Sequence, residues 1–139
     1  MQKTYTPKES DIKRNWHEIS VNGKILGRVA SEIAVLLTGK KKPYFVRHLD
    51  CGDYVVVTET EKIKVTGKKL TTKTYDSFSG YPGGLKQELL KDLLQRKPEE
   101  VIRHAVSGML PKNKLRDQYL KRLYIYVGTD HPYKEKIGK

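Results

Sequence analysis

The sequence predicts an α/β fold built around a parallel sheet, and three successive features support that class. Residues 15–20 are typical of a short strand. Apolar residues then recur at helical spacing over 27–38, and Gly39 supplies a helix stop. A run of valines at 55–57 follows, and such a run is typical of a strand that is covered on both faces. Strand, helix and strand in this order indicate a βαβ crossover, which joins parallel strands.

Polar segments flank this core. Residues 1–14 lack an apolar period and predict an N-terminal arm, while residues 128–139 predict a polar tail. Pro43 and the lysines before it predict a loop over residues 40–50. We therefore expect a single domain whose α/β core spans residues 15–127.

The second half of the chain predicts further strands, a glycine-rich loop and three helices. Residues 70–77 predict a less buried strand and residues 123–127 a final one, whereas residues 61–66 suit either a helical turn or a strand. Three glycines and a proline within Ser79–Gly84 predict a loop. The three helices begin near Leu85, at Pro98 and near Asn113. The sheet is therefore expected to have about four strands.

The chain carries a large positive charge for its length. Its 139 residues include 28 Lys and Arg against 16 Asp and Glu, which gives a formal net charge of +12. A charge of this size indicates a polyanionic partner. The grouping of the excess cations favours such a partner, either nucleic acid or an anionic membrane surface, over merely solvated faces. The excess lies in three segments: Lys40, Lys41, Lys42 and Arg47; Lys62, Lys64, Lys68, Lys69 and Lys73; and Lys112, Lys114, Arg116, Lys121 and Arg122.

Composition and sequence pattern also exclude several classes of protein. No stretch approaches the roughly 18 consecutive apolar residues of a membrane span. Residues 1–13 contain no apolar region of the kind found in secretory signals. The single cysteine, Cys51, excludes a disulfide framework and fits a reducing compartment. We therefore expect a cytoplasmic protein with no membrane partner.

The motifs of catalysis and cofactor binding are incomplete. The Gly-Lys pair at 67–68 lacks the other residues of a P-loop, and the glycines at 23 and 27 lack the third glycine of a dinucleotide-binding motif. His48 and Cys51 are too few ligands for a zinc site. We expect no cofactor, no metal and no small-molecule substrate. The alternative that stays open is a small nucleotide-binding enzyme that acts on RNA.

Aromatic residues accompany the basic segments. Tyr44 follows the lysines at 40–42, and Tyr81 lies in the glycine-rich loop, where small neighbours let a phosphate backbone approach closely. Exposed aromatic rings among cations can stack on unpaired bases. The sequence matches none of the RNP, KH, zinc-finger and helix-turn-helix motifs. These residues therefore favour recognition of structured RNA through its shape and its phosphates.

Long blocks of the sequence then occur in a characteristic order. They are KTYTPK at 3–8, GKILGRVASEIAVLLTGK at 23–40, KPYFVRHLDCGDYVVV at 42–57, KVTGKK at 64–69, SGYPGGLK at 79–86, GMLPKN at 108–113 and LKRLYIYVG at 120–128. These blocks resemble the bacterial type of the large-subunit ribosomal protein L-thirteen family, over residues 3–132. The chain departs from that family at Arg116 and Asp117, where glycine is usual, and at Phe78, where histidine is common.

The resemblance implies a three-layer α/β/α domain with a small, mainly parallel sheet and a structural rather than enzymatic role. It implies a ribosomal location, binding of large-subunit ribosomal RNA, action early in subunit assembly and contacts with neighbouring ribosomal proteins. Some members are also linked to repression of their own messenger RNA. We predict these RNA contacts: Lys40, Lys41, Lys42, Tyr44, Arg47, His48, Lys68, Lys69, Tyr81, Lys112, Lys114, Arg116, Lys121 and Arg122.

Overall fold

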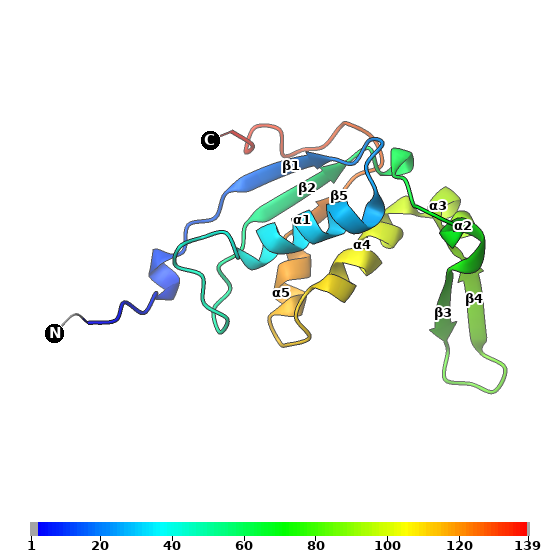
Figure 1. Cartoon of the computed structure of the whole chain (residues 1–139), viewed down its shortest axis with the longest axis horizontal. Helices are drawn as coiled ribbons and strands as arrows, with labels where there is room; N and C mark the ends of the chain where they lie inside the picture. The colour runs from blue at the N-terminus through cyan, green and yellow to red at the C-terminus, as the bar shows by residue number, and fades with distance from the viewer. Residues whose placement is uncertain (1–2, 139) are drawn as a thin grey trace.

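A three-stranded parallel sheet forms the centre of the molecule (Figure 1). The computed structural model describes residues 3–138. Its strand order is β1 (Trp16–Ser20), β2 (Tyr54–Thr58) and β5 (Leu123–Ile125). Trp16 lies beside Tyr54 and Val55 lies beside Leu123, and both strand pairs are parallel. The α/β class and the small, mainly parallel sheet are confirmed.

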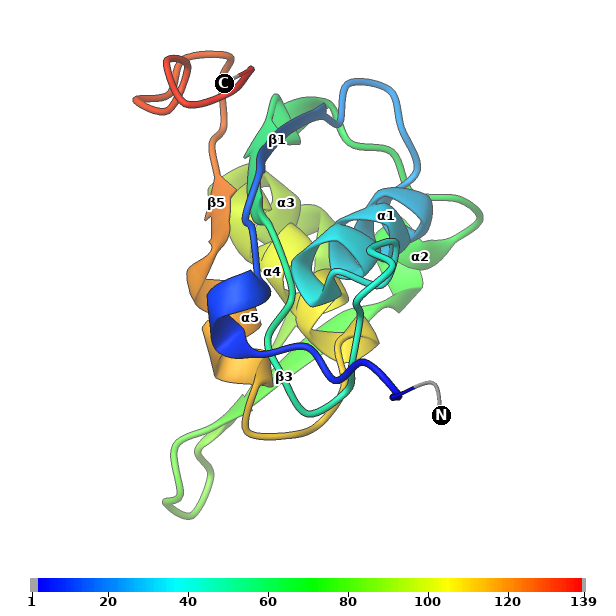
Figure 2. The ribbon, with the colours of Figure 1, turned by 90° about the vertical axis from the view of Figure 1, so that its left-hand side faces the viewer.

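Helices α1 (Leu26–Thr38) and α4 (Pro98–Met109) cover one face of this sheet (Figure 2). Val29, Ile33 and Leu37 recur every four residues on α1 and are buried against the valines of β2. As predicted, α1 ends at Gly39, whose φ of 72° is left-handed and suits glycine. As also predicted, α4 starts at Pro98.

The C-terminal segment, residues 128–138, runs along the other face of the sheet (Figure 2) and packs there against aromatic side chains. The rings of Trp16 and Tyr54 stack with their centroids 4.4 Å apart, and Tyr133 stacks on Trp16 at 4.9 Å. His131 is buried, with Nε2 3.4 Å from Glu18 Oε1. The second covering layer in the described part of the chain is thus this segment rather than a helix.

Strands β3 (Thr74–Phe78) and β4 (Leu85–Leu89) form an antiparallel hairpin that projects from the body (Figure 1). The predicted strand at 70–77 is therefore corrected to a short helix α2 (Lys69–Thr72) followed by β3. The helix predicted from Leu85 starts only at Leu90, as α3 (Leu90–Arg96). Residues four apart share a face in a helix and in a strand alike, so leucine spacing did not separate the two. The central sheet has three strands rather than about four, because β3 and β4 pair only with each other.

The remaining elements are short. Helical turns occur at Glu9–Asp11 and Thr60–Lys62, and the segment after the second turn holds one bridge, from Lys64 to Ile25. The helix predicted near 113–122 is shortened to α5 (Arg116–Lys121). The side chain of Asn113 accepts a hydrogen bond from the Leu115 N–H and holds a turn before it.

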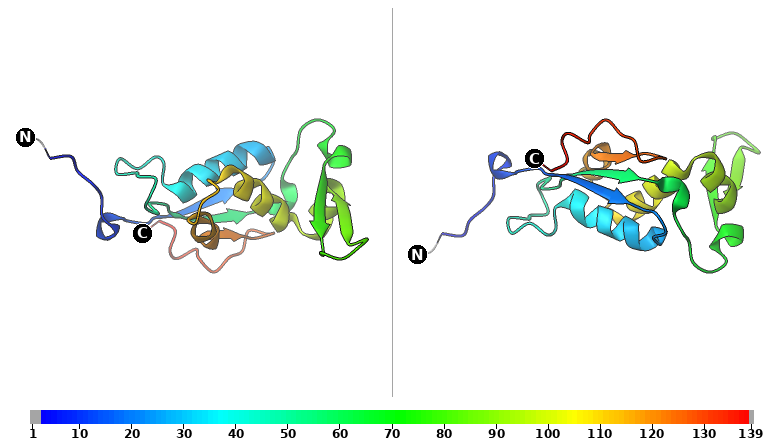
Figure 3. Two further views of the ribbon diagram at one scale, coloured as in Figure 1. Left: turned by 90° about the horizontal axis from the view of Figure 1, so that it is seen from below. Right: turned by 90° about the horizontal axis from the view of Figure 1, so that it is seen from above.

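Because the three strands are parallel, the molecule has two unlike ends. The segments that enter the strands, residues 3–15, 39–53 and 110–122, meet at the amino end of the sheet. Helix α2 and the hairpin lie toward the other end of the long axis (Figures 1 and 3). The predicted RNA contacts are therefore distributed over both ends.

Candidate nucleic-acid interface

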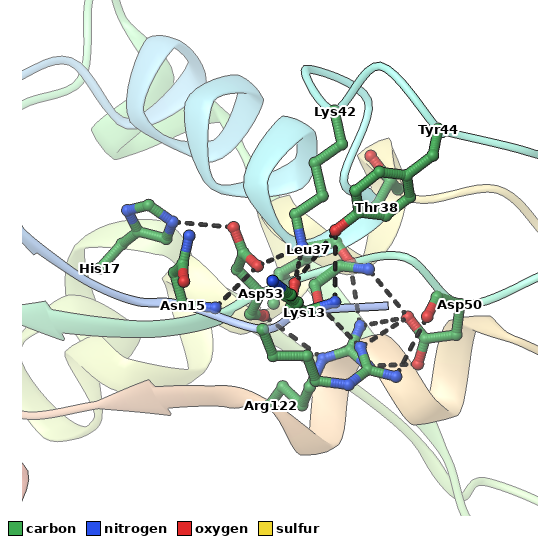
Figure 4. Close-up of polar contacts among 12 residues, drawn as sticks. Lys13, Asn15, His17, Leu37, Thr38, Lys42, Tyr44, Asp50, Asp53 and Arg122 are labelled. Atoms are coloured by element: carbon green, nitrogen blue, oxygen red, sulfur yellow. Dashed lines mark hydrogen bonds and ion pairs between the residues drawn. The ribbon is translucent and has the colours of Figure 1, made fainter. Parts of the chain in front are cut away.

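The residues directly before the three parallel strands meet at the amino end of the sheet (Figure 4). Asn15 precedes β1, Asp53 precedes β2 and Arg122 precedes β5, so the strand register sets them side by side. The Asn15 N–H donates to Asp53 Oδ1 at 3.0 Å, and Arg122 Nε donates to the Asp53 carbonyl at 3.3 Å. Three segments that are distant in sequence thus form one polar network.

Arg122 holds the loop before β2 in place. Its guanidinium donates to both carboxylate oxygens of Asp50, with Nη2 2.6 Å from Oδ1. Nη2 also donates to the Leu37 carbonyl at 3.0 Å. The residue is only 7% exposed. Since a bidentate pair fixes both the direction and the plane of the carboxylate, Arg122 ties the loop to the start of β5 and the end of α1.

Asp53 gathers a second set of partners. Its Oδ1 lies 2.5 Å from Lys42 Nζ, and its Oδ2 lies 2.8 Å from His17 Nε2. Lys42 Nζ also donates to the Lys13 carbonyl at 2.6 Å, and the Lys42 side chain is 14% exposed. Carboxylates this deep in a protein need such partners. The charge of Lys42 is consequently neutralised within the chain.

The N-terminal arm is joined to the same network. Arg14 Nη1 donates to the Gly52 carbonyl at 2.7 Å, and Nη2 donates to the Asp50 carbonyl at 3.0 Å. The Tyr44 hydroxyl donates to the Lys13 carbonyl at 3.2 Å. The end of the arm and the loop that follows α1 are therefore fixed to one another.

The two carboxylates of the network are held in their charged form. Burial acts to raise the pKa of Asp50, but the hydrogen bonds and charge of Arg122 outweigh it and hold that pKa below its ordinary value. Burial also acts to raise the pKa of Asp53, but the hydrogen bonds from Lys42, Asn15 and His17 together with the charge of Lys42 outweigh it and lower that pKa. Both groups are therefore ionised at neutral pH and neutralise their own cations.

Two glycines let backbone segments of the loop approach closely. A Cβ on Gly52 would lie 1.6 Å from the Leu37 carbonyl oxygen, and a Cβ on Gly39 would lie 2.3 Å from the Cys51 carbonyl oxygen. A larger residue at either position requires the backbone to move. The loop is thus clamped against the end of α1 at both of its ends.

A groove of about 540 Å³ opens between α1, the 39–50 loop and the segment after α4. Lys40, Arg47 and Asn113 supply charged and polar groups to its wall, and both cations are exposed. The rest of the wall is mainly apolar: Ala34, Val35, Phe45, Met109, Pro111 and Tyr119. An apolar surface with cations beside it suits a flat ring that carries a phosphate.

The predicted RNA contacts divide into three groups by position. One group lies at the amino end of the sheet and is exposed, apart from the half-buried Arg116; we refer to it as the basic edge. It consists of Lys40, Lys41, Arg47, His48, Lys112, Lys114, Arg116 and Lys121. Lys42, Tyr44 and Arg122, which the sequence also predicts as RNA contacts, are held by contacts within the chain. Lys68, Lys69 and Tyr81 lie on α2 and the hairpin, away from the basic edge (Figure 1).

Sequence reasoning missed the acids that organise this site. Asp50 and Asp53 stand between a basic loop and a buried strand, and that position was the available signal. Arg14 and His17 carried no comparable signal, because their partners lie 36 or more positions away in the chain. Parallel pairing of the strands is what brings these four residues together.

Within residues 3–138, no group of three or more His, Cys, Asp or Glu side chains is placed to hold a metal ion. Of the helices in this range, none is long and apolar enough to cross a membrane. Cys51 is a buried free thiol.

Known proteins resemble this chain over almost its full length. Residues 14–132 match the sequence profile of the family Ribosomal protein L13. The large ribosomal subunit protein uL13 of Dehalococcoides mccartyi is 55% identical over 97% of this chain and 94% of the relative. The uL13 proteins of Chlorobium phaeovibrioides and Aquifex aeolicus are 52% and 54% identical, over 96% and 94% of this chain and 90% and 91% of the relatives. These relatives are named as ribosomal proteins rather than as enzymes, and this chain belongs to the ribosomal protein L13 family.

Proposed function

We propose that this protein is a structural constituent of the large ribosomal subunit in the cytoplasm and binds large-subunit ribosomal RNA through the basic edge. The observation that carries the proposal is the groove, where Lys40 and Arg47 stand beside a mainly apolar wall. Membership in the L13 family supports the ribosomal assignment. Enzymatic activity, the alternative function, has no support among the named relatives.

In this function the cations neutralise RNA phosphates that would otherwise repel one another. Each phosphate contact releases condensed counterions, which favours binding at low salt. The polar network contributes by holding the loop of Lys40 and Arg47 in one conformation before RNA arrives. Little conformational entropy is then lost on binding, which favours affinity.

Two finer roles belong to the same proposal. By joining RNA segments on a prefolded α/β body, the protein acts early in subunit assembly beside neighbouring ribosomal proteins. Repression of its own messenger RNA uses the same basic edge, because shape and phosphate recognition do not distinguish two RNAs that share a fold.

Salt-dependent binding to a large-subunit ribosomal RNA transcript tests the proposal. We expect the variant Lys40→Glu with Arg47→Glu to bind more weakly than the unmodified protein. Loss of two phosphate contacts makes the plot of log affinity against log salt less steep by about 1.4 to 1.8. The matched control is Lys91→Glu with Lys134→Glu. It changes the net charge by the same amount as the test variant, but its substitutions lie on α3 and the C-terminal segment.

The control separates a specific surface from general charge. We expect the control pair to keep at least half of the unmodified affinity. An equal loss in both pairs, or no binding by the unmodified protein at low salt, would contradict the proposal.

A further inference from the structure

The β3–β4 hairpin carries a group of large apolar side chains that are exposed. Phe78 is 67% exposed, Tyr81 is 75% exposed and Leu85 is 58% exposed. Phe78 and Leu85 are directly opposite one another in the antiparallel register, and Tyr81 lies in the loop that joins them. Directly opposed side chains share one face, so Phe78 and Leu85 form one patch, and Tyr81 lies in the loop next to it.

The two faces of the hairpin differ in what they contact. Side chains alternate along each strand, so Tyr75 and Glu88 lie on the face opposite to Phe78. Tyr75 packs against the core, and Glu88 accepts hydrogen bonds from Arg96 at 2.6 and 3.1 Å. This inner face is therefore turned to the body, whereas the outer face, with Phe78 and Leu85, has no comparable cover among residues 3–138.

The charge distribution of the hairpin indicates that its outer face does not contact RNA. Residues 74–89 hold one lysine against two acids, in a chain with a net charge of +12. The lysine, Lys86, lies on the inner face by register, and Asp76 is the charge on the outer face. Base-stacking surfaces on proteins combine aromatic rings with cations that neutralise the phosphates. An apolar patch next to a carboxylate lacks those cations.

We propose that this outer face, which we name the hairpin patch (Phe78, Tyr81, Leu85 and Leu89), docks into an apolar pocket with a basic rim on a neighbouring protein of the large subunit. Aromatic enrichment with few charges is the composition of protein–protein contact centres. The basic rim complements Asp76. This assigns Tyr81 to a protein contact in place of the base stacking that the sequence predicts, and it rests on the proposed function, since the partner is sought within the subunit.

Photo-crosslinking within assembled large subunits tests the partner. A benzophenone amino acid replaces Tyr81 in the full chain, and the subunits are purified and irradiated. We expect a crosslinked species that is larger than this chain. Protease treatment should reduce its size, whereas ribonuclease should leave its size unchanged. A crosslink to RNA, a crosslink to a second copy of this chain, or no crosslink in subunits that contain the protein would overturn the inference.

A competition experiment tests the energetic contribution. Phe78→Ala with Leu85→Ala and the unmodified chain, carrying different tags, are expressed together. We expect the variant to be under-represented in subunits by about tenfold or more, as for loss of a contact centre. Leu70→Ala, at an apolar residue of α2 that is 41% exposed, is the control and is expected to compete equally.

Binding to isolated RNA distinguishes failure of this inference from failure of the proposed function. The Phe78→Ala/Leu85→Ala variant is expected to bind the ribosomal RNA transcript within twofold of the unmodified protein. A loss of RNA affinity in this variant would place the patch on RNA and overturn the inference alone. Absence of the unmodified protein from large subunits would overturn the proposed function together with this inference.

Discussion

Arg122 and Asp50 meet across 72 positions of the sequence, with Arg122 Nη2 2.6 Å from Asp50 Oδ1. The pair connects the first residue before β5 to the loop that carries Lys40, Lys41, Arg47 and His48 of the basic edge. Its side chains are largely buried, at 9% and 11% exposed. The position of the loop that presents Lys40, Lys41 and Arg47 is therefore set by contacts within the chain.

Removing one partner of this pair is expected to be strongly destabilising. Arg122→Ala removes the bidentate partner of the Asp50 carboxylate and the donor to the Leu37 carbonyl, which lowers the free energy of unfolding by about 3 to 5 kcal/mol. Denaturant unfolding followed by Trp16 fluorescence measures the change. The neighbouring Lys121→Ala, at an exposed residue, is expected to stay within about 0.5 kcal/mol of the unmodified protein. Equal effects at the two positions would show that the pair contributes little.

The close approach at Gly52 predicts a second large effect. Gly52→Ala puts a methyl group where the Leu37 carbonyl oxygen stands, so the loop must shift and the free energy of unfolding falls by at least about 2 kcal/mol. Gly108→Ala is the matched control, because the added methyl group meets no atom within 4 Å and the position is inside α4. There we expect a gain of about 0.5 to 1 kcal/mol. A stable Gly52→Ala protein would disprove the clamp.

Stability is expected to fall at acid pH through the two carboxylates of the network. Their folded pKa values lie below the ordinary value of 3.8, so the unfolded chain takes up protons first as the pH falls. The stabilisation is fully present above pH 4 or so and is lost as the pH drops from there through the folded pKa values. Unfolding midpoints between pH 6 and 2 measure this. Asp53→Asn should start less stable and show a shallower decline; an unchanged slope would exclude Asp53 as a source.

The stacked aromatic rings under the C-terminal segment predict a spectroscopic change. Trp16 is the only tryptophan of the chain, and Tyr133 stacks on it at 4.9 Å. Tyr133→Ala uncovers the indole, so its fluorescence emission should move to longer wavelength and its quenching by iodide should increase. Lys134→Ala, at a residue that pairs with Asp130 instead, should leave the spectrum unchanged. If the Tyr133 variant kept the original spectrum, the C-terminal segment would not be what covers Trp16.

The parts of the fold with one dominant period were predictable from sequence. Helix α1, its stop at Gly39 and the buried valines of β2 follow directly from pattern. The hairpin was misassigned because Leu85 and Leu89 satisfy both the helical and the strand period. Charge counting predicted the cations of the basic edge and grouped Arg122 with them, because a tally of cations does not reveal which of them has a buried acid as partner. That information lies in the pairing of strands whose residues are 36 to 72 positions apart.

The position of β5 near the end of the chain affects how the protein matures as it is made. Until Arg122 has left the ribosome that synthesises it, Asp50 has no bidentate partner and the loop of Lys40 and Arg47 is not yet held. Chains emerge from the N-terminus first, at about 5 to 20 residues per second. Several seconds therefore pass between the synthesis of Asp50 and that of Arg122. A truncated product that lacks β5 would expose its cations on a loose loop, without the fixed spacing that complete copies present. The fixed position of this loop is in this way reserved for chains whose synthesis has passed Arg122.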